Sequence, residues 1–317
     1  MGWRTREFVM IKLIWRRFVR EPTAVAGGAA VIALIFAVGI GPFVVGHSSI
    51  AIDHAIMGYP QPPSLEHLLG TDLLGRDELA RALVGGRISI SIGVTAMCVA
   101  IIFGTLYGAV AGAAGGAIDA VMMRIVDALF SFPTFFLIIT VEALTNQFAI
   151  ATIVLILGLL SWMGVARLVR AEVLSLRGRD FVEAARALGV SQARLVLRHL
   201  VPNALAPVIV AATLAIGDNI LAETGLSYLG LGVQPPTPSW GNMLQDALLP
   251  AARNSPWLVL TPGLLIVTTL VAFALCGEGL RAAIDVAADQ ATTTTADIDE
   301  PPLNAYIAED ERLRPAL

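Results

Sequence analysis

Long apolar stretches alternate with short charged segments along most of the chain. A helix needs about 20 mostly apolar residues to cross a membrane. One stretch, 128–166, carries Glu142 as its only charge and is too long for a single crossing, so we expect a break within 142–147. The pattern predicts an all-α polytopic membrane protein with six transmembrane helices, at about 22–46, 88–113, 125–144, 147–167, 204–226 and 257–278.

The distribution of arginine predicts which side of the membrane each loop faces. Six basic residues lie in 1–22 and seven arginines in 167–202, whereas 47–84 holds only two and 227–256 only one. Loops rich in Lys and Arg stay in the cytoplasm. We therefore expect both termini and the 167–202 loop to be cytoplasmic, and the other two loops to face outward.

Three regions follow from these patterns. Residues 1–21 mix basic and apolar side chains, which is typical of an amphipathic helix on the cytoplasmic membrane surface, although a solvated terminus fits equally well. Residues 22–284 form the six-span domain. Residues 285–317 are acidic and include a threonine run and Pro301–Pro302, so we expect a disordered cytoplasmic tail.

Composition and missing motifs narrow the function. Hydrophobic residues make up 56% of the chain and charged residues 15%, against about 25% charged in soluble domains. The sequence has no P-loop, no zinc-type spacing of His or Cys, and no G-x-S-x-G elbow. We expect no cofactor, no catalysis and no nucleic-acid partner. Cys98 and Cys276 lie in apolar runs and read as packing residues.

Glycines recur every four residues in and just after the second predicted span, at Gly104, Gly108, Gly112 and Gly116. They share one helix face, where a second helix can approach closely. This spacing indicates helix packing.

Two carboxylates fall in the fifth predicted span, Asp218 and Glu223. Placing a carboxylate inside a membrane costs free energy, so an acidic residue in a span is a candidate functional residue. Their spacing of five residues points them about 140° apart on a helix, a poor arrangement for a carboxylate pair. We favour polar residues near the outer mouth, where water is available, over a gate or pathway lining.

The basic loop contains a predicted pair of short helices. Residues 183–202 read EAARALGVSQARLVLRHLVP. Glu183–Leu188 favours a helix, Gly189 is placed to end it, and Ser191 is a plausible cap for a second helix. We expect Pro202 to separate this unit from the fifth span. Small alanine side chains on the first helix suit a groove in a partner protein.

Three motifs carry a resemblance to a known family. Glu183-Ala184-Ala185-x3-Gly189-x9-His199-x-Val201-Pro202 resembles the EAA loop of ABC-importer permeases, although that loop prefers an aliphatic residue at His199 and Leu at Val201. The stretches 67–77 (HLLGTDLLGRD, followed by GRIS at 86–89) and 226–241 (LSYLGLGVQPPTPSWG) are similar to the peptide-importer branch. The match covers about residues 10–285 and is nearest to C-type subunits of dipeptide and oligopeptide importers.

The resemblance implies a type I importer permease in the bacterial inner membrane. Such a chain pairs with a homologous B-type permease, two cytoplasmic ATPase subunits (or one fused chain) and an extracytoplasmic substrate-binding protein. ATP and Mg²⁺ bind on the ATPases, which bind the two transporter states with different affinity. The coupling loop would be 168–203, with its contact to an ATPase made by Glu183, Ala184, Ala185, Leu188, Gly189, His199 and Pro202.

The outward-facing motifs also supply candidate residues. Asp72, Arg76 and Asp77 lie between turn-forming glycines, and Trp240 precedes a possible re-entrant or interfacial helix at 241–252. We expect Arg76 to pair with a nearby carboxylate. For Asp72, Arg76 and Asp77 we favour fold maintenance over contact with the binding protein, whereas the segment that follows Trp240 could form part of an outer gate or a docking rim.

Two alternatives to peptide import stay open. Related permeases carry nickel chelates, opines or glutathione, and the permease sequence does not separate these cargoes. An ion-coupled secondary transporter using Asp218 or Glu223 is the second, although such proteins usually show inverted repeats, and no internal repeat is evident.

Overall fold

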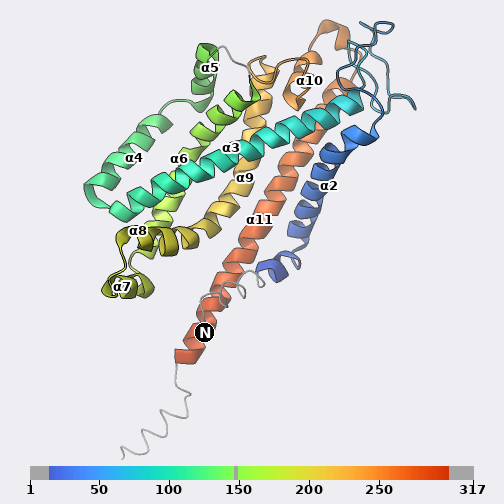
Figure 1. Cartoon of the computed structure of the whole chain (residues 1–317). Helices are drawn as coiled ribbons and strands as arrows, with labels where there is room; N and C mark the ends of the chain where they lie inside the picture. Colours follow the sequence, from blue (N-terminus) through green and yellow to red (C-terminus); the bar gives the residue numbers. More distant parts are fainter. Residues whose placement is uncertain (1–13, 146–148, 300–317) are drawn as a thin grey trace, which may run out of the picture.

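The structure, a computed structural model, describes residues 14–145 and 149–299, apart from some side chains. Every regular element in these ranges is a helix, and Thr71 and Asp77 form an isolated bridge. Five helices pack lengthwise into a bundle (Figure 1). They are α2 (Pro22–Val44), α3 (Glu78–Ala114), α6 (Ile150–Leu176), α9 (Val201–Tyr228) and α11 (Trp257–Asp299). All five are long and apolar enough to cross a membrane.

The third predicted span is two helices instead of one. The chain forms α4 (Gly116–Phe130) and α5 (Thr134–Thr145), where a single helix at 125–144 was expected. Pro133 lies within the break, directly before α5, and proline disfavours helical geometry in the residue before it. Figure 1 shows α4 starting where α3 ends and α5 near the opposite end, so together the two helices return the chain along the bundle.

Several helices are longer than the apolar stretches from which they were predicted. Helix α3 begins at Glu78, ten residues before the expected 88, and α6 continues past 167 to Leu176. Helix α11 runs to Asp299, although we expected a span ending at 278 and disorder from 285. Hydropathy locates membrane-crossing segments, whereas helices extend as far as caps and charge pairs allow. Most of the basic N-terminal segment, 1–13, and the tail residues 300–317 lie outside the described residues.

The prediction that Pro202 separates the basic loop from the fifth span is wrong. Short helix α8 (Gln192–Leu195) passes through a π-helical turn, Val196–Leu200, directly into α9. Proline lacks an N–H and its ring clashes with the carbonyl four residues earlier in an α-helix. The wider π turn immediately before Pro202 avoids that conflict, and the helix continues unbroken.

Close approach of α3 and α6 forms the centre of the bundle. A Cβ added at Gly104 or Gly108 would collide with the backbone of α6, at the carbonyls of Trp162 and Ala166, and one at Gly112 would meet Val173. The glycine spacing therefore marks a helix contact, as predicted. Gly116 is the exception, because it begins α4 and faces open space.

The two ends of the bundle carry different elements. At one end lie the long loop between α2 and α3, short helix α10 (Trp240–Asp246) and the 3₁₀ turn Pro250–Ala252. At the other end lie α7 (Asp180–Ala187), α8 and the last turns of α11 (Figure 1). We call these the outer end and the inner end.

Candidate functional site

Helix α7 projects from the inner end and is attached mainly along one edge. Val182 is fully buried, in a cluster with Val173, Leu195 and Leu200. The opposite side of the helix is exposed, and Leu188, directly after it, exposes 84% of its surface. An apolar side chain that projects into solvent next to small alanines suits a partner protein.

The end of α7 is fixed by its backbone. Gly189 has a φ of +76°, a conformation that only glycine adopts without strain. The N–H of Val190 donates to the carbonyl of Ala185 at 3.1 Å, and the N–H of Gly189 to that of Arg186 at 2.9 Å. These bonds form a Schellman end, at the position predicted from sequence.

The other predicted members of the loop lie where α8 enters α9. His199 is half-buried in the π turn, and Pro202 is exposed one residue into α9. Leu195 and Leu200 connect this segment to the cluster that holds Val182, which continues along α9 through Ala204 and Val208. Side chains of α7, α8 and α9 therefore pack in one continuous cluster.

Three arginines of the basic segment 167–202 connect helices at the inner end. Arg170 on α6 donates two hydrogen bonds to Asp119 on α4, at 2.5 and 2.6 Å, and Arg167 donates to Asp127 at 2.6 Å. Arg177 reaches the carbonyl of Gly112 at 3.0 Å. The sequence signal for these pairs is weak. Asp119 and Asp127 are eight residues apart, about two helical turns, which places them on one face of a helix but does not name a partner.

A buried charge network organises the outer end. Asp72 accepts hydrogen bonds from the backbone N–H of Arg76 at 2.9 Å and from its side-chain Nε at 2.6 Å. Arg81 lies 3.2 Å from the same carboxylate. Both guanidinium groups also reach Asp246 at the end of α10, at 3.1 and 2.9 Å. Two arginines and two aspartates thus join the loop, α3 and α10.

Asp77 and Trp240 fix the same junction. The Asp77 carboxylate caps α3 by accepting from the N–H of Ala80 at 2.7 Å. Trp240 is fully buried, and its Nε1 donates to the carbonyl of Ala82 at 3.0 Å. None of Asp72, Arg76, Asp77 and Trp240 exposes more than 7% of its surface, which favours fold maintenance for all four.

Sequence reasoning missed Arg81 and Asp246 in this network. Arg81 precedes the expected start of the span at 88, so hydropathy alone predicts that it lies in a loop. The pattern Asp77-Glu78-x-x-Arg81 indicates a helix start at these residues, because acidic residues at the first turn are followed by a basic side chain one turn later on the same face. Nothing local to Asp246 reveals a partner 165 residues away.

The two carboxylates of α9 lie in different environments. Asp218 is exposed in this chain, while Glu223 is fully buried. The expectation that both reach water is wrong for Glu223, whose Oε1 accepts from Ser227 at 2.7 Å. The Ser227 oxygen in turn accepts the N–H of Val233 at 3.0 Å. Glu223 therefore belongs to the packing between α9 and the segment before α10.

Comparison with known proteins defines the class. The family model of binding-protein-dependent transport system inner membrane components matches residues 104–288, and the chain belongs to this family of ABC-importer permeases. It is an inner-membrane protein. Membership in this family decides against an ion-coupled secondary transporter.

Further matches place the chain near one branch of the family. The N-terminal domain model of oligopeptide transport permease C matches residues 10–63. The chain is 42% identical to the oligopeptide transport system permease protein OppC of Escherichia coli K12, over 85% of this chain and 89% of the relative. The OppC protein of Haemophilus influenzae is 39% identical, over 85% and 86%. The glutathione transport system permease protein GsiD of Escherichia coli O6:K15:H31 is 41% identical, over 86% and 88%. The chain is thus a C-type permease of the oligopeptide type.

Proposed function

We propose that this chain forms half of the membrane pathway of a peptide importer and couples to an ATPase through α7. The pathway is completed by a homologous B-type permease. Two cytoplasmic ATPase subunits, or one fused chain, bind below, and an extracytoplasmic protein delivers substrate. ATP and Mg²⁺ bind only to the ATPases, and this chain catalyses no reaction and carries no cofactor of its own.

The orientation of the chain follows from the two ends. We assign the inner end to the cytoplasm, because the seven arginines of 167–202 lie on the elements around α7. The chain then crosses the membrane six times, with α4 and α5 together making the third crossing. Both termini are cytoplasmic in this arrangement.

The exposed side of α7 carries the coupling proposal. Leu188 exposes 84% of its surface beside Glu183, Ala184 and Gly189, while Val182 alone is fully buried along the helix. Closure of the ATPase pair on ATP would push this helix. The buried cluster from Val182 to Leu200 and Val208 would pass the movement to α9.

The proposed cargo is a dipeptide or oligopeptide. Similarity to two OppC proteins supports it, while the equally similar GsiD keeps glutathione as the second candidate. Nickel chelates and opines are weaker alternatives from related permeases. Uptake of labelled peptides of two to five residues, competed by glutathione, distinguishes the first two.

Substitution of Leu188 tests the coupling. We expect Leu188→Arg to leave the fold of this chain intact, because the side chain is exposed in it, and to abolish ATP-driven uptake in vesicles containing the whole transporter. The matched control is Leu65→Arg, since Leu65 exposes 99% of its surface at the outer end. Uptake by Leu188→Arg equal to that of the control would contradict the role of α7.

A further inference from the structure

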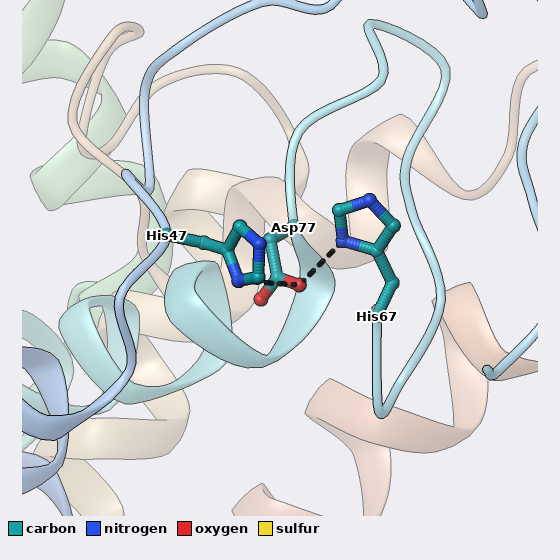
Figure 2. A group of neighbouring side chains, drawn as sticks. All are labelled: His47, His67 and Asp77. Atoms are coloured by element: carbon teal, nitrogen blue, oxygen red, sulfur yellow. Dashed lines mark hydrogen bonds and ion pairs between the residues drawn. The ribbon is translucent and has the colours of Figure 1, made fainter. Parts of the chain in front are cut away.

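Two histidines and an aspartate converge at the outer end, away from the proposed coupling site. His47 follows the end of α2, His67 lies in the loop before α3, and Asp77 caps α3 (Figure 2). One ligand atom from each lies within 4.8 Å of the other two. The imidazole rings are 5.0 Å apart, tilted by 44°, and both present Nδ1 to the same oxygen of Asp77.

A hydrogen bond accounts for only one of the histidines. His67 Nδ1 lies 2.8 Å from Asp77 Oδ2, an ordinary hydrogen-bond distance. His47 Nδ1 lies 3.9 Å from the same oxygen, which is too far for a hydrogen bond. His47 thus faces a carboxylate already hydrogen-bonded to His67, at a distance that an ion pair or a bridging cation can span.

The spacing of the three atoms suits a small divalent cation. Zinc bonds of about 2.0–2.2 Å to nitrogen and oxygen, in tetrahedral geometry, place ligand atoms about 3.4 Å apart. The two distances to Asp77 Oδ2, 2.8 and 3.9 Å, bracket that value. Two imidazoles and one carboxylate are a donor set that favours zinc and its first-row neighbours over calcium or magnesium.

Two of the three ligands are already held in place. The other Asp77 oxygen accepts the N–H of Ala80, which turns Oδ2 toward the histidines. The His67 backbone is fixed in a turn, since its carbonyl accepts from Ser64 and Gly70 at 2.8 and 2.9 Å. Only His47, whose side chain is 45% exposed, has to move, and its exposure gives an ion access from solvent.

We propose that His47, His67 and Asp77 bind a divalent transition-metal ion, with Zn²⁺ as the reference ion. Bound metal joins the end of α2 to the start of α3. Phe43 and Val44 at this end of α2 expose 80% and 75% of their surfaces within this chain, so the metal would add a link that side-chain packing does not supply there. Three protein ligands leave a coordination position for water, so the ion is exchangeable.

Zinc titration of the intact transporter tests the proposal. The full-length chain, purified with its partner subunits and without a polyhistidine tag, is titrated with Zn²⁺ against a chromophoric chelator. We expect one ion per chain in excess of the His47→Ala complex. Loss of a residue that only orients a metal ligand typically lowers metal affinity about 10–100-fold. Loss of the ligand His47 itself should lower the affinity for Zn²⁺ by at least about 100-fold. Co²⁺ in place of Zn²⁺ should give visible absorption bands that the variant lacks.

The chain supplies matched variants. His54→Ala is the control, because His54 is exposed in the same loop and outside the cluster. Asp77→Asn keeps a helix-capping residue while removing the anionic ligand. His47→Ala is decisive, because His47 makes no hydrogen bond to Asp77 whose loss would disturb folding.

The outcomes separate cleanly. Binding that is lost in His47→Ala and Asp77→Asn but kept in His54→Ala supports the site. Zinc should also raise the unfolding temperature of the wild type and His54→Ala, and leave that of His47→Ala unchanged. Binding unaffected by His47→Ala, or no binding at all, overturns the proposal.

Discussion

The outer and inner ends of this permease are built in opposite ways. At the outer end, Arg76 and Arg81 are buried between Asp72 and Asp246, and Trp240, the first residue of α10, is buried against α3. At the inner end, α7 is an exposed helix fixed by Val182 and a backbone turn at Gly189.

The difference lies in the contacts that each end makes within this chain. Buried charges are tolerated only when their partners are present, and the outer end supplies them within one chain. The inner end leaves Leu188 and its alanine neighbours in solvent, a surface that a second protein can cover. A charge network formed within this chain at the outer end and an exposed α7 at the inner end suit a subunit whose inner end contacts a partner protein.

The largest effect is expected at the outer charge network. Arg81→Met removes a partner of both Asp72 and Asp246 and leaves negative charge poorly compensated in a buried site, so we expect a loss of about 3–5 kcal/mol in stability. Thermal unfolding of the purified complex measures it. The control is Arg87→Met, on an exposed part of the same helix, where we expect less than about 0.5 kcal/mol. Equal effects would remove the contrast between a buried network and surface charge.

A smaller loss is expected where α3 meets α6. A methyl group at Gly108 would collide with the carbonyl of Ala166, a backbone atom that cannot turn aside. Gly108→Ala should therefore cost about 1–3 kcal/mol, measured by thermal unfolding. Gly164→Ala on α6 faces open space and should be neutral or stabilising, because alanine favours helix more than glycine. Tolerance of both changes would refute the close approach.

The buried hydroxyl of Ser227 should contribute less than the glycine contact. Ser227→Ala removes the donor to Glu223 and the acceptor of the Val233 N–H, and we expect a cost of about 1–2 kcal/mol. Glu223→Gln keeps an acceptor for Ser227 and should leave both stability and transport nearly unchanged. Loss of transport by Glu223→Gln in a normally assembled complex would instead give this carboxylate a role in the pathway.

The smallest effect on stability is expected at the inner end. Gly189→Ala meets no neighbouring atom, so its cost is the left-handed backbone alone, about 1 kcal/mol. The strain should stay local: amide exchange across α7 should accelerate while the unfolding temperature of the complex barely changes. Gly178→Ala, in open space without a positive φ, is the control and should accelerate nothing.

The sequence predicted what depends on local pattern. Gly189 reveals the end of α7 because a positive φ selects glycine, and Gly104, Gly108 and Gly112 reveal a helix contact because their spacing is helical. The network around Asp246 joins segments 165 residues apart, so no local pattern contains it. The start of α3 was misplaced because charged side chains were taken as loop, whereas here they are paired and buried inside the first turns of the helix.

The break at Pro133 and the continuity through Pro202 show a second limit. Proline ended a helix at the first position and not at the second. The outcome at Pro202 depends on a π turn at Val196–Leu200, a rearrangement of backbone hydrogen bonds that the residue sequence does not signal.

Site-directed cross-linking in membranes tests the proposed coupling most directly. With Cys98 and Cys276 replaced by Ser, Ala184→Cys places a single thiol on the exposed side of α7, and Leu65→Cys places one at the outer end. A heterobifunctional reagent, with one thiol-reactive end and one photoreactive end, should join Ala184→Cys to an ATPase subunit, with the yield changing on ATP binding, and should leave Leu65→Cys without any ATPase adduct. Failure of Ala184→Cys to reach an ATPase in a transporter that still imports its substrate would contradict the account.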